Sequence, residues 1–346
     1  MRPKWDFSSA PVQCIYWRTI SLYGNKSDMR ILRHCENIPA DLTGATVVIG
    51  NFDGVHRGHQ AVIGRAAEIA RAASTPLIAM TFEPHPRRYF QPDGDPFRLT
   101  PFRTKVSQIN ALGVDAMLVV RFNRKFSQFS GEAFVDQVLL GGLQAKHVVV
   151  GYDFTFGRDR GGDTNLLATR AKTDGFVFES VDPVASADDV IYSSTAIRNH
   201  LTAGKPGHAA ALLGRPFEIA GRVAHGDAIG RTIGFRTANV LLADYLKPAF
   251  GIYAVRVGIE ADNDIAWHGA VANLGTRPTV GGTKPLLEPH IFDFNEDIYG
   301  QRIRVAFIEY IRPEVHFASM EEMTRQMEND CEVARRILKT RAAGAA

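Results

Sequence analysis

Two histidines three positions apart, His56 and His59, are the first residues of the chain whose types and spacing suggest chemistry. They stand in the segment VVIGNFDGVHRGHQAVIGRAAEIA, where an apolar run typical of a strand leads through a turn with two glycines into a helical pattern. The first turn of a helix presents free backbone N–H groups, which bind anions. Imidazoles at that place can contact a polyphosphate, and Gly58 lets a phosphate approach the backbone closely. The segment therefore predicts a phosphate site.

Other interpretations of this pair are weaker. A His-x-x-His pair beside a turn is often only solvated or part of a helix cap, and the strand, turn and helix context is what favours a nucleotide. The sequence contains no G-x-x-x-x-G-K-[ST] loop. Zinc held by His56 and His59 would lack further ligands at a recognisable spacing. We therefore expect nucleotide phosphate without a Walker loop or a zinc ion.

A second group of polar residues follows in Tyr192-Ser193-Ser194-Thr195-Ala196-Ile197-Arg198. Its hydroxyls suit a helix N-cap, with Arg198 one turn further on; such caps are common whatever a helix does. Phosphoryl and nucleotidyl transfer depend mainly on positioning and on neutralisation of charge, so a second helix start with an arginine would complement the histidines. No covalent nucleophile is required.

A third group lies in the C-terminal half. Thr237 and Asn239 alternate on a predicted strand, so that their side chains face the same side. A hydroxyl and an amide oxygen suit Mg²⁺ beside a triphosphate, although a polar edge strand explains these two residues equally well. Glu288 begins a later apolar strand, where it is either solvated or able to accept a proton from a substrate hydroxyl.

The elements that must position these residues change in kind along the chain. From residue 45 to about 200, short β-branched runs alternate with helical patterns, which predicts a parallel sheet with right-handed crossovers, an α/β doubly wound fold. Ligands of such sheets bind beyond the carboxyl ends of the strands. Strands are predicted at Thr46–Ile49, Leu77–Phe82, Ala116–Phe122, His147–Val150 and Phe176–Val181, and helices at Gly58–Ala72, Arg103–Leu112, Gly131–Leu140 and Thr164–Lys172.

After a loop at Thr202–Gly207 the pattern becomes strand after strand, separated by turns that contain Gly and Pro. This predicts a small antiparallel β-barrel, against which a C-terminal helix at Ser319–Leu338 packs. The barrel strands are predicted at Phe217–Ala224, Ile252–Val257, Ala266–Val271, His290–Phe294 and Ile303–Tyr310.

Length and composition are consistent with two domains, predicted at residues 29–203 and 208–346. The net charge is only +3, with no block of like charges, so nucleic acid is not an expected partner. The three cysteines lack metal-ligand spacing, and their odd number favours a reducing compartment. No apolar run approaches the roughly 18 residues of a membrane span, so no membrane association and a cytoplasmic location are expected. Residues 1–28 lack a periodic pattern and are interpreted as a disordered extension, or as a mis-assigned start that precedes a true start at Met29.

Seven segments together carry a family resemblance. GNFDGVHRGHQ, TFEPHPRRYF, GYDFTFGRDRGGD and YSSTAIR resemble the adenylyltransferase module of the bacterial bifunctional riboflavin kinase/FAD synthetase family. GRVAHGDAIGRTIGFRTAN, ANLGTRPT and LEPHIFDFNEDIYGQRIRV resemble its riboflavin kinase module and cover about residues 214 to 315. The resemblance implies that the barrel converts riboflavin and ATP to FMN, and that the N-terminal domain converts FMN and a second ATP to FAD and pyrophosphate. Both steps would use Mg²⁺, with ATP as co-substrate.

Residue roles follow from the resemblance by position. It implies that Glu288 is the catalytic base of the kinase, and that His56 and His59 serve catalysis by holding ATP phosphates. The implied ATP site of the adenylyltransferase consists of Gly50, Asn51, Phe52, His56, Gly58, His59, Ser194, Thr195 and Arg198, and its flavin site is bordered by Asp153 and by the loop from Phe154 to Gly157. The implied ATP site of the kinase consists of Gly226, Gly230, Arg231, Thr237 and Asn239, of which Thr237 and Asn239 also meet the metal.

Two positions depart from the family pattern. Arg236 stands where the family motif has proline, which loosens the strand entry and adds a cation beside the expected metal site. Asp153 stands where the family often has asparagine. Two alternatives therefore stay open: an adenylyltransferase whose barrel only binds flavin, and a non-catalytic flavin-sensing protein. Oligomeric state and direct transfer of FMN between the two sites also stay open.

Overall fold

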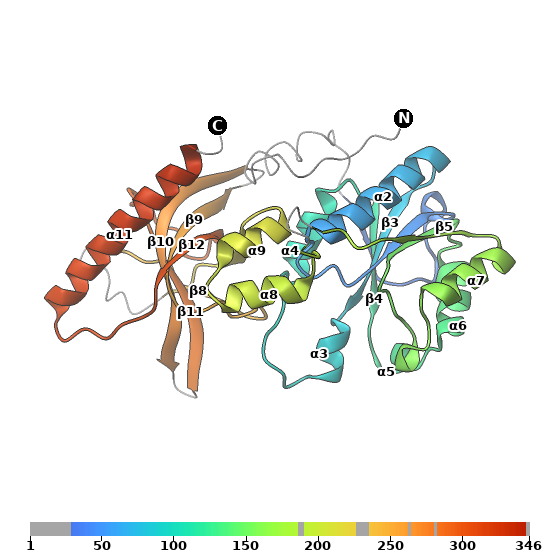
Figure 1. Cartoon of the computed structure of the whole chain (residues 1–346), viewed down its shortest axis with the longest axis horizontal. Coiled ribbons are helices and arrows are strands. Elements are labelled where there is room, and N and C mark those ends of the chain that lie inside the picture. The colour runs from blue at the N-terminus through green and yellow to red at the C-terminus, as the bar shows by residue number, and fades with distance from the viewer. Residues whose placement is uncertain (1–28, 186–189, 226–234, 262–263, 280–281, 344–346) are drawn as a thin grey trace. The chain divides into compact units, whose positions relative to one another are not determined.

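The computed structural model describes residues 29–185, 190–225, 235–261, 264–279 and 282–343. Their contacts divide the chain into two compact units (Figure 1). The N-terminal unit contains residues 29–95 and 102–192, and the C-terminal unit contains residues 96–101 and the described chain from 193 onward. The predicted extension at 1–28 and three predicted ATP ligands, Gly226, Gly230 and Arg231, lie outside the described residues.

The N-terminal unit is built on a six-stranded sheet with every strand parallel to its neighbours. The strand order is β1-β4-β3-β2-β5-β6. The strands are β1 (Arg30–Leu32), β2 (Thr46–Ile49), β3 (Leu77–Glu83), β4 (Ala116–Arg121), β5 (His147–Gly151) and β6 (Val177–Val181). The prediction of a doubly wound parallel sheet is confirmed, and the five predicted strands agree with β2 to β6 to within a residue or so at each end.

Helices cover both faces of this sheet because its strands alternate side chains between two apolar clusters. Val48 and Ala79 pack with α2 (Arg57–Ala73) and α4 (Phe102–Asn110). Val47 and Ile78 face the opposite cluster, which contains residues of α6, η2 and α7. These elements are α6 (Gly131–Phe134), the π-helical η2 (Val135–Gly142) and α7 (Thr164–Asp174), and the short connections hold η1 (Ala40–Leu42), α3 (Pro86–Phe90), α5 (Arg124–Ser127) and η3 (Arg158–Arg160).

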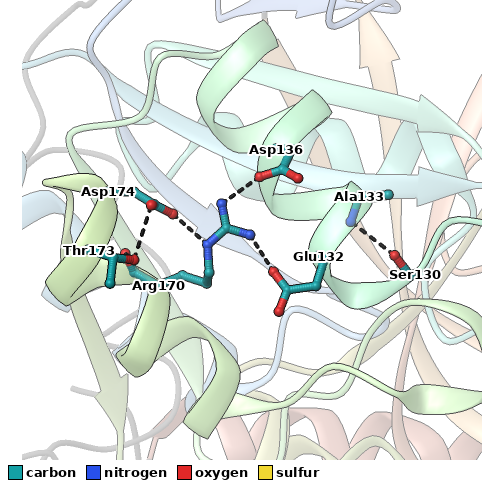
Figure 2. A network of polar contacts seen from close by, with 7 residues as sticks. All are labelled: Ser130, Glu132, Ala133, Asp136, Arg170, Thr173 and Asp174. Atoms are coloured by element: carbon teal, nitrogen blue, oxygen red, sulfur yellow. Dashed lines mark hydrogen bonds and ion pairs between the residues drawn. The ribbon is translucent and has the colours of Figure 1, made fainter.

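A single arginine joins α7 to α6 and η2. Figure 2 shows the Arg170 guanidinium among three carboxylates, those of Glu132, Asp136 and Asp174, each of which it contacts. Hydrogen bonds to these carboxylates, above all to Asp136, raise the pKa of Arg170. The arginine therefore fixes the helix that follows the loop with Asp153 against the helix that precedes β5.

The C-terminal unit is a six-stranded antiparallel sheet in the order β7-β12-β9-β10-β11-β8. The strands are β7 (Phe217–Arg222), β8 (Val240–Leu241), β9 (Gly251–Ala261), β10 (Asp264–Thr279), β11 (Gly282–Ile291) and β12 (Arg302–Arg312). The two edges approach each other, since the Ala224 amide donates to the Asn239 carbonyl at 2.8 Å. A Cβ on Gly221 would lie 2.6 Å from the Val240 side chain. The predicted barrel is thus confirmed, and it is nearly closed.

Three helices accompany the barrel strands in the part of the chain that the structure describes. The C-terminal helix α11 (Met320–Ala343) packs Ala334 and Leu338 against Ala254 and Val271 of the sheet, as predicted. Helices α8 (Ser194–Thr202) and α9 (Pro206–Leu213) belong to this unit by their contacts, one of which joins the Ala249 amide to the Leu201 carbonyl at 3.0 Å. The domain boundaries at 203 and 208 stay a prediction.

Three strand predictions in the barrel had the wrong bounds. Strands β9 and β10 extend well beyond the strands predicted at Ile252–Val257 and Ala266–Val271. The expected strand at His290–Phe294 is the end of β11, which begins at Gly282 and stops at Ile291. Asp293 has a φ of 55°, a left-handed conformation that a strand does not accommodate. No described helix combines the length and the apolar character that a bilayer crossing requires.

Candidate functional site

The sheet topology brings two predicted site loops to one edge. From β2 the chain proceeds through β3 to β4 on one side, and it then crosses to β5 and β6 on the other side. β2 and β5 are parallel neighbours, so their carboxyl ends meet where the strand order reverses. The turn after β2 contains Asn51 and His56, and the loop after β5 contains Asp153. A crevice for a nucleotide and a second substrate is expected at this place in a doubly wound sheet.

The turn after β2 has a tightly constrained backbone. Phe52 and Val55 have φ values of 49° and 41°, and Gly54 between them has 91°. A β-branched valine is rare in the left-handed region, and such conformations persist where the surroundings impose them, often at functional sites. The Phe52 ring lies against Gly50, where a Cβ would be 2.9 Å from the ring. The Gln60 amide holds the Val55 carbonyl at 2.8 Å. Gly50 is therefore required by packing within the turn.

The two histidines are stacked at the start of α2. His56 is the N-cap residue, and its Nδ1 accepts the His59 backbone N–H at 3.3 Å. Because Nδ1 accepts, neutral His56 carries its proton on Nε2. The ring centroids are 3.6 Å apart, and the Phe52 ring meets His59 edge-on at 5.4 Å. A Cβ on Gly58 would lie 3.1 Å from the His56 ring and 3.2 Å from the Tyr192 carbonyl. Gly58 thus leaves room for the backbone of Tyr192, the first residue of the YSSTAIR segment.

A buried lysine supports the same turn and was missed by the sequence analysis. The Lys105 side chain is only 1% exposed, and its ammonium lies 3.2 Å from the Glu83 carboxylate and 3.4 Å from the Thr81 hydroxyl. That hydroxyl donates to the Asn51 carbonyl at 3.3 Å. A chain of polar contacts therefore connects α4, the carboxyl end of β3 and the turn after β2.

The loop after β5 presents Asp153 to solvent and turns Phe154 inward. Phe154 stacks on Phe156 with ring centroids 5.4 Å apart. Phe156 and Gly162 pair through two backbone hydrogen bonds of 2.9 Å, and a Cβ on Gly162 would lie 2.7 Å from the Phe156 ring. The loop ends at Asp163, which caps α7; the Leu166 amide lowers the pKa of this carboxyl. The loop is therefore held at both ends beside the carboxyl end of β5.

The polar residues of the YSSTAIR segment open α8. Ser193 is the N-cap residue and accepts the Ala196 amide at 3.1 Å, so that Ser194 begins the helix and Thr195 is exposed in its first turn. Arg198 donates through Nε to the Phe97 carbonyl at 2.9 Å. The predicted hydroxyl cap is therefore present, although the capping residue is Ser193.

In the barrel, strand register brings Glu288 between two asparagines. Leu241 and Val240 pair with Leu286 and Leu287, and the Ala238 amide continues this register with a 2.9 Å bond to the Pro289 carbonyl. Asn239 is therefore directly opposite Glu288. On the other side of β11, Asn273 of β10 is paired with Glu288. Directly opposite residues share a face, and their Cβ atoms are roughly 5 Å apart. The predicted metal ligand and the predicted base are thus neighbours.

The next position along the same face contains Thr237 and His290. The His290 ring bonds through Nδ1 to the Arg236 carbonyl at 2.8 Å, so Nδ1 carries the proton. The Arg236 guanidinium itself donates to the Asn295 carbonyl at 3.4 Å. Arg236 is therefore fixed to the loop after β11 and to His290, and the sequence analysis gave no role to His290.

The described residues contain no group of three or more His, Cys, Asp or Glu side chains that could hold a metal ion. The donors predicted for Mg²⁺ are instead a hydroxyl and an amide oxygen. Asn239 is 7% exposed, and its Oδ1 has no hydrogen-bond partner among the residues that the structure describes. A buried acceptor without a donor is costly, and a hydrated cation would satisfy it. Asn239 therefore fits the expected metal.

Comparison with known proteins agrees with both halves of the chain. A family model described as FAD synthetase matches residues 38–196, and one described as riboflavin kinase matches residues 213–338. Proteins named bifunctional riboflavin kinase/FMN adenylyltransferase are similar over most of their length. The one from Escherichia coli K12 is 41% identical over 87% of this chain and 96% of its own. The one from Haemophilus influenzae is 39% identical over 89% and 98%.

A solved structure shares the fold of the whole chain. It comes from Streptococcus pneumoniae, is described as a macrolide-efflux protein, and matches with a TM-score of 0.79 at 30% identity. The match covers 89% of this chain and 99% of that one.

A doubly wound sheet with two histidines at a helix start, followed by a barrel with a carboxylate beside an amide, is consistent with a two-module enzyme of nucleotide chemistry. With the relatives above, the chain belongs to the bifunctional riboflavin kinase/FMN adenylyltransferase family. The C-terminal module is the riboflavin kinase and the N-terminal module is the FMN adenylyltransferase, with ATP as co-substrate of both.

Proposed function

We propose that Glu288 is the base of the kinase step and that Thr237 and Asn239 hold Mg²⁺ beside it. The observation that carries this proposal is the strand register, which sets Glu288 directly opposite a buried Asn239 whose Oδ1 has no partner among the described residues. Riboflavin presents a neutral hydroxyl, which is a poor nucleophile. Glu288 takes the hydroxyl proton as that oxygen forms its bond to the γ-phosphorus of ATP, and the bond to ADP breaks. When bound, Mg²⁺ neutralises phosphate charge.

We propose a different division of labour in the N-terminal module. The nucleophile there is the phosphate of FMN, which is already anionic, so no residue needs to remove a proton. The task is to hold the ATP phosphates while an FMN phosphate oxygen attacks the α-phosphorus and pyrophosphate leaves. His56 is suited to this because its Nδ1 caps α2, which fixes its ring at the helix start where backbone N–H groups bind anions.

The remaining residues of the adenylyltransferase site are assigned by motif position. Ser194, Thr195 and Arg198 would bind ATP phosphates, and Asp153 and Phe154 would border the flavin. Support comes from the helix start at Ser194 and from the placement of Asp153 at the carboxyl end of β5. In the kinase, Gly226, Gly230 and Arg231 would complete the ATP site by the same motif argument.

One experiment separates the two modules without dividing the chain. Phosphorylation of riboflavin releases ADP, whereas adenylylation of FMN releases pyrophosphate, so each product reports one site. Glu288→Gln should lower ADP formation on the order of 100-fold or more. It should leave pyrophosphate release from supplied FMN unchanged. Glu309→Gln, a half-exposed carboxylate of β12 that pairs with Arg341 of α11, is the control. Normal ADP formation by Glu288→Gln would show that Glu288 is not the base of the kinase step.

A further inference from the structure

Asn273 lies on the other side of Glu288 from the proposed metal ligand Asn239, and it is not among the predicted site residues. The ladder of β10 and β11 pairs Asn273 directly with Glu288. The next residue in the row is Ile252 of β9, which packs with the cluster under α11. On this face of the barrel, Asn273 therefore lies between the polar Glu288 and the apolar Ile252.

The orientation of the Asn273 amide is set by Glu314. The amide Nδ2 donates to the Glu314 carboxylate at 3.2 Å. An ionised carboxylate can only accept, so the nitrogen must face Glu314 and the oxygen must face away from it. The reverse orientation would set two acceptors against each other.

The missing side chain at Gly275 leaves room for the Glu314 carboxylate. Gly275 follows Asn273 by two residues on the same face, and a Cβ there would lie 2.1 Å from the Glu314 carboxylate. Any side chain at this position would displace Glu314 from Asn273. The glycine, the carboxylate and the amide thus form one arrangement that directs the amide oxygen.

The Asn273 oxygen has no donor of its own among the described residues. Its Oδ1 is buried, and no hydrogen bond reaches it from the part of the chain that the structure describes. A buried acceptor that is held in one orientation and left without a donor is matched by a donor from a ligand. Its cross-strand neighbour is the proposed base, so the ligand group must lie close to the reacting hydroxyl.

We infer that Asn273 binds the polyol chain of riboflavin, accepting a hydrogen bond from a hydroxyl next to the one that Glu288 deprotonates. The flavin ring does not supply this donor. Asn273 thereby positions the reacting hydroxyl and selects flavins that carry a polyol, with Glu314 as the residue that orients it. This inference rests on the proposed kinase site.

The test compares riboflavin with lumiflavin, which has the same ring system and a methyl group in place of the polyol. ADP formation reports the kinase alone, so it gives kcat/KM for riboflavin and the inhibition constant of lumiflavin at that site. Asn273→Ala should lower kcat/KM for riboflavin about tenfold, the effect of one lost hydrogen bond. It should change the lumiflavin constant less than about twofold, because lumiflavin has no polyol to bind. Asn273→Ser, which keeps an oxygen acceptor, should fall between the two proteins.

The orienting carboxylate is tested in the same assay. Glu314→Gln should lower kcat/KM for riboflavin several-fold with the lumiflavin constant unchanged, while Glu309→Gln should alter neither value. Equal losses for both flavins after Asn273→Ala would assign the contact to the ring or to folding, and an unchanged kcat/KM would overturn the inference outright. An unchanged lumiflavin constant shows that the barrel of each variant is folded, and pyrophosphate release from FMN shows the same for the N-terminal module. If Glu288 is not the base, Glu288→Gln will form ADP at the normal rate. This result distinguishes failure of the base assignment from failure of the inference about Asn273.

Discussion

Removal of the Lys105 ammonium tests the polar contacts that support the turn after β2. Lys105→Met keeps most of the side-chain volume and deletes the charge that lies 3.2 Å from Glu83. Breaking a buried ion pair costs about 3–5 kcal/mol, because the remaining charge stays poorly hydrated. The Glu83 side chain is 17% exposed and keeps some hydration. We therefore expect about 2–3 kcal/mol of destabilisation.

In a unit of this size each kcal/mol lowers Tm by roughly 2–4 °C, so the expected shift is roughly 4–12 °C. The measurement is thermal unfolding of the whole chain, followed by the pyrophosphate and ADP assays at a temperature where the variant is folded. Pyrophosphate release should fall several-fold, because the Thr81 hydroxyl that holds Asn51 loses a neighbour. ADP formation should be unchanged.

Two further variants make this experiment decisive. Lys172→Met removes an exposed lysine of the same unit and should leave both Tm and activity unchanged. The double variant Lys105→Met/Glu83→Gln should recover much of the stability, since neither residue then carries a charge in the buried site. A Tm shift below about 1 °C for Lys105→Met would refute the reasoning, because loss of such a deeply buried ion pair should measurably lower the free energy of unfolding.

The remaining predictions concern the two sites and their supports. His59→Ala should lower pyrophosphate release at least roughly tenfold and leave ADP formation intact; full FAD synthesis by the folded variant would exclude a phosphate role. Arg236→Pro should leave ADP formation equal or faster, because the guanidinium contacts the Asn295 carbonyl; a raised KM for ATP would show instead that Arg236 binds phosphate. Arg170→Met should raise the KM for FMN with less effect on the KM for ATP, because α7 loses its contacts to Glu132 and Asp136; equal changes in both constants would contradict a local role beside the flavin loop. Burial lowers the pKa of His147, so its unfolded form binds a proton first as the pH falls through about 6.5. The N-terminal unit should therefore lose stability below that pH, and His147→Gln should lose less, in thermal scans at pH 8 and pH 5.

The sequence was most informative where local pattern decides the structure. Strands β2 to β5 followed from short apolar runs, since buried parallel strands are nearly continuous in hydrophobic residues. The position of His56 and His59 at the start of α2 also followed from local order, because a strand, a glycine turn and a helix leave little freedom between Gly50 and His59. Both conclusions depend on contacts close in sequence.

Residues missed by the sequence analysis owe their environment to distant partners. Lys105 looks like a surface lysine, and only its spacing of four from the buried Ile109 indicates that it faces inward. Asn273 is paired with Glu288 on β11 and donates to Glu314 after β12. The sequence of either segment alone does not show which residues of the two strands face each other. The strand expected at His290–Phe294 failed for a related reason, because apolar residues continue past the turn at Asp293.

The contact between the two edges of the barrel sheet affects how kinase activity is gained during folding. The bond between the Ala224 amide and the Asn239 carbonyl joins the two edges of the sheet, and Asn239 is also the residue opposite the proposed base. Closure of the barrel and completion of the proposed kinase site are therefore one event. A sheet that is still open lacks the edge residue that is proposed to hold Mg²⁺. Phosphorylation of riboflavin should therefore return in a single step with closure of the barrel during refolding. ADP formation can then be used to follow this closure.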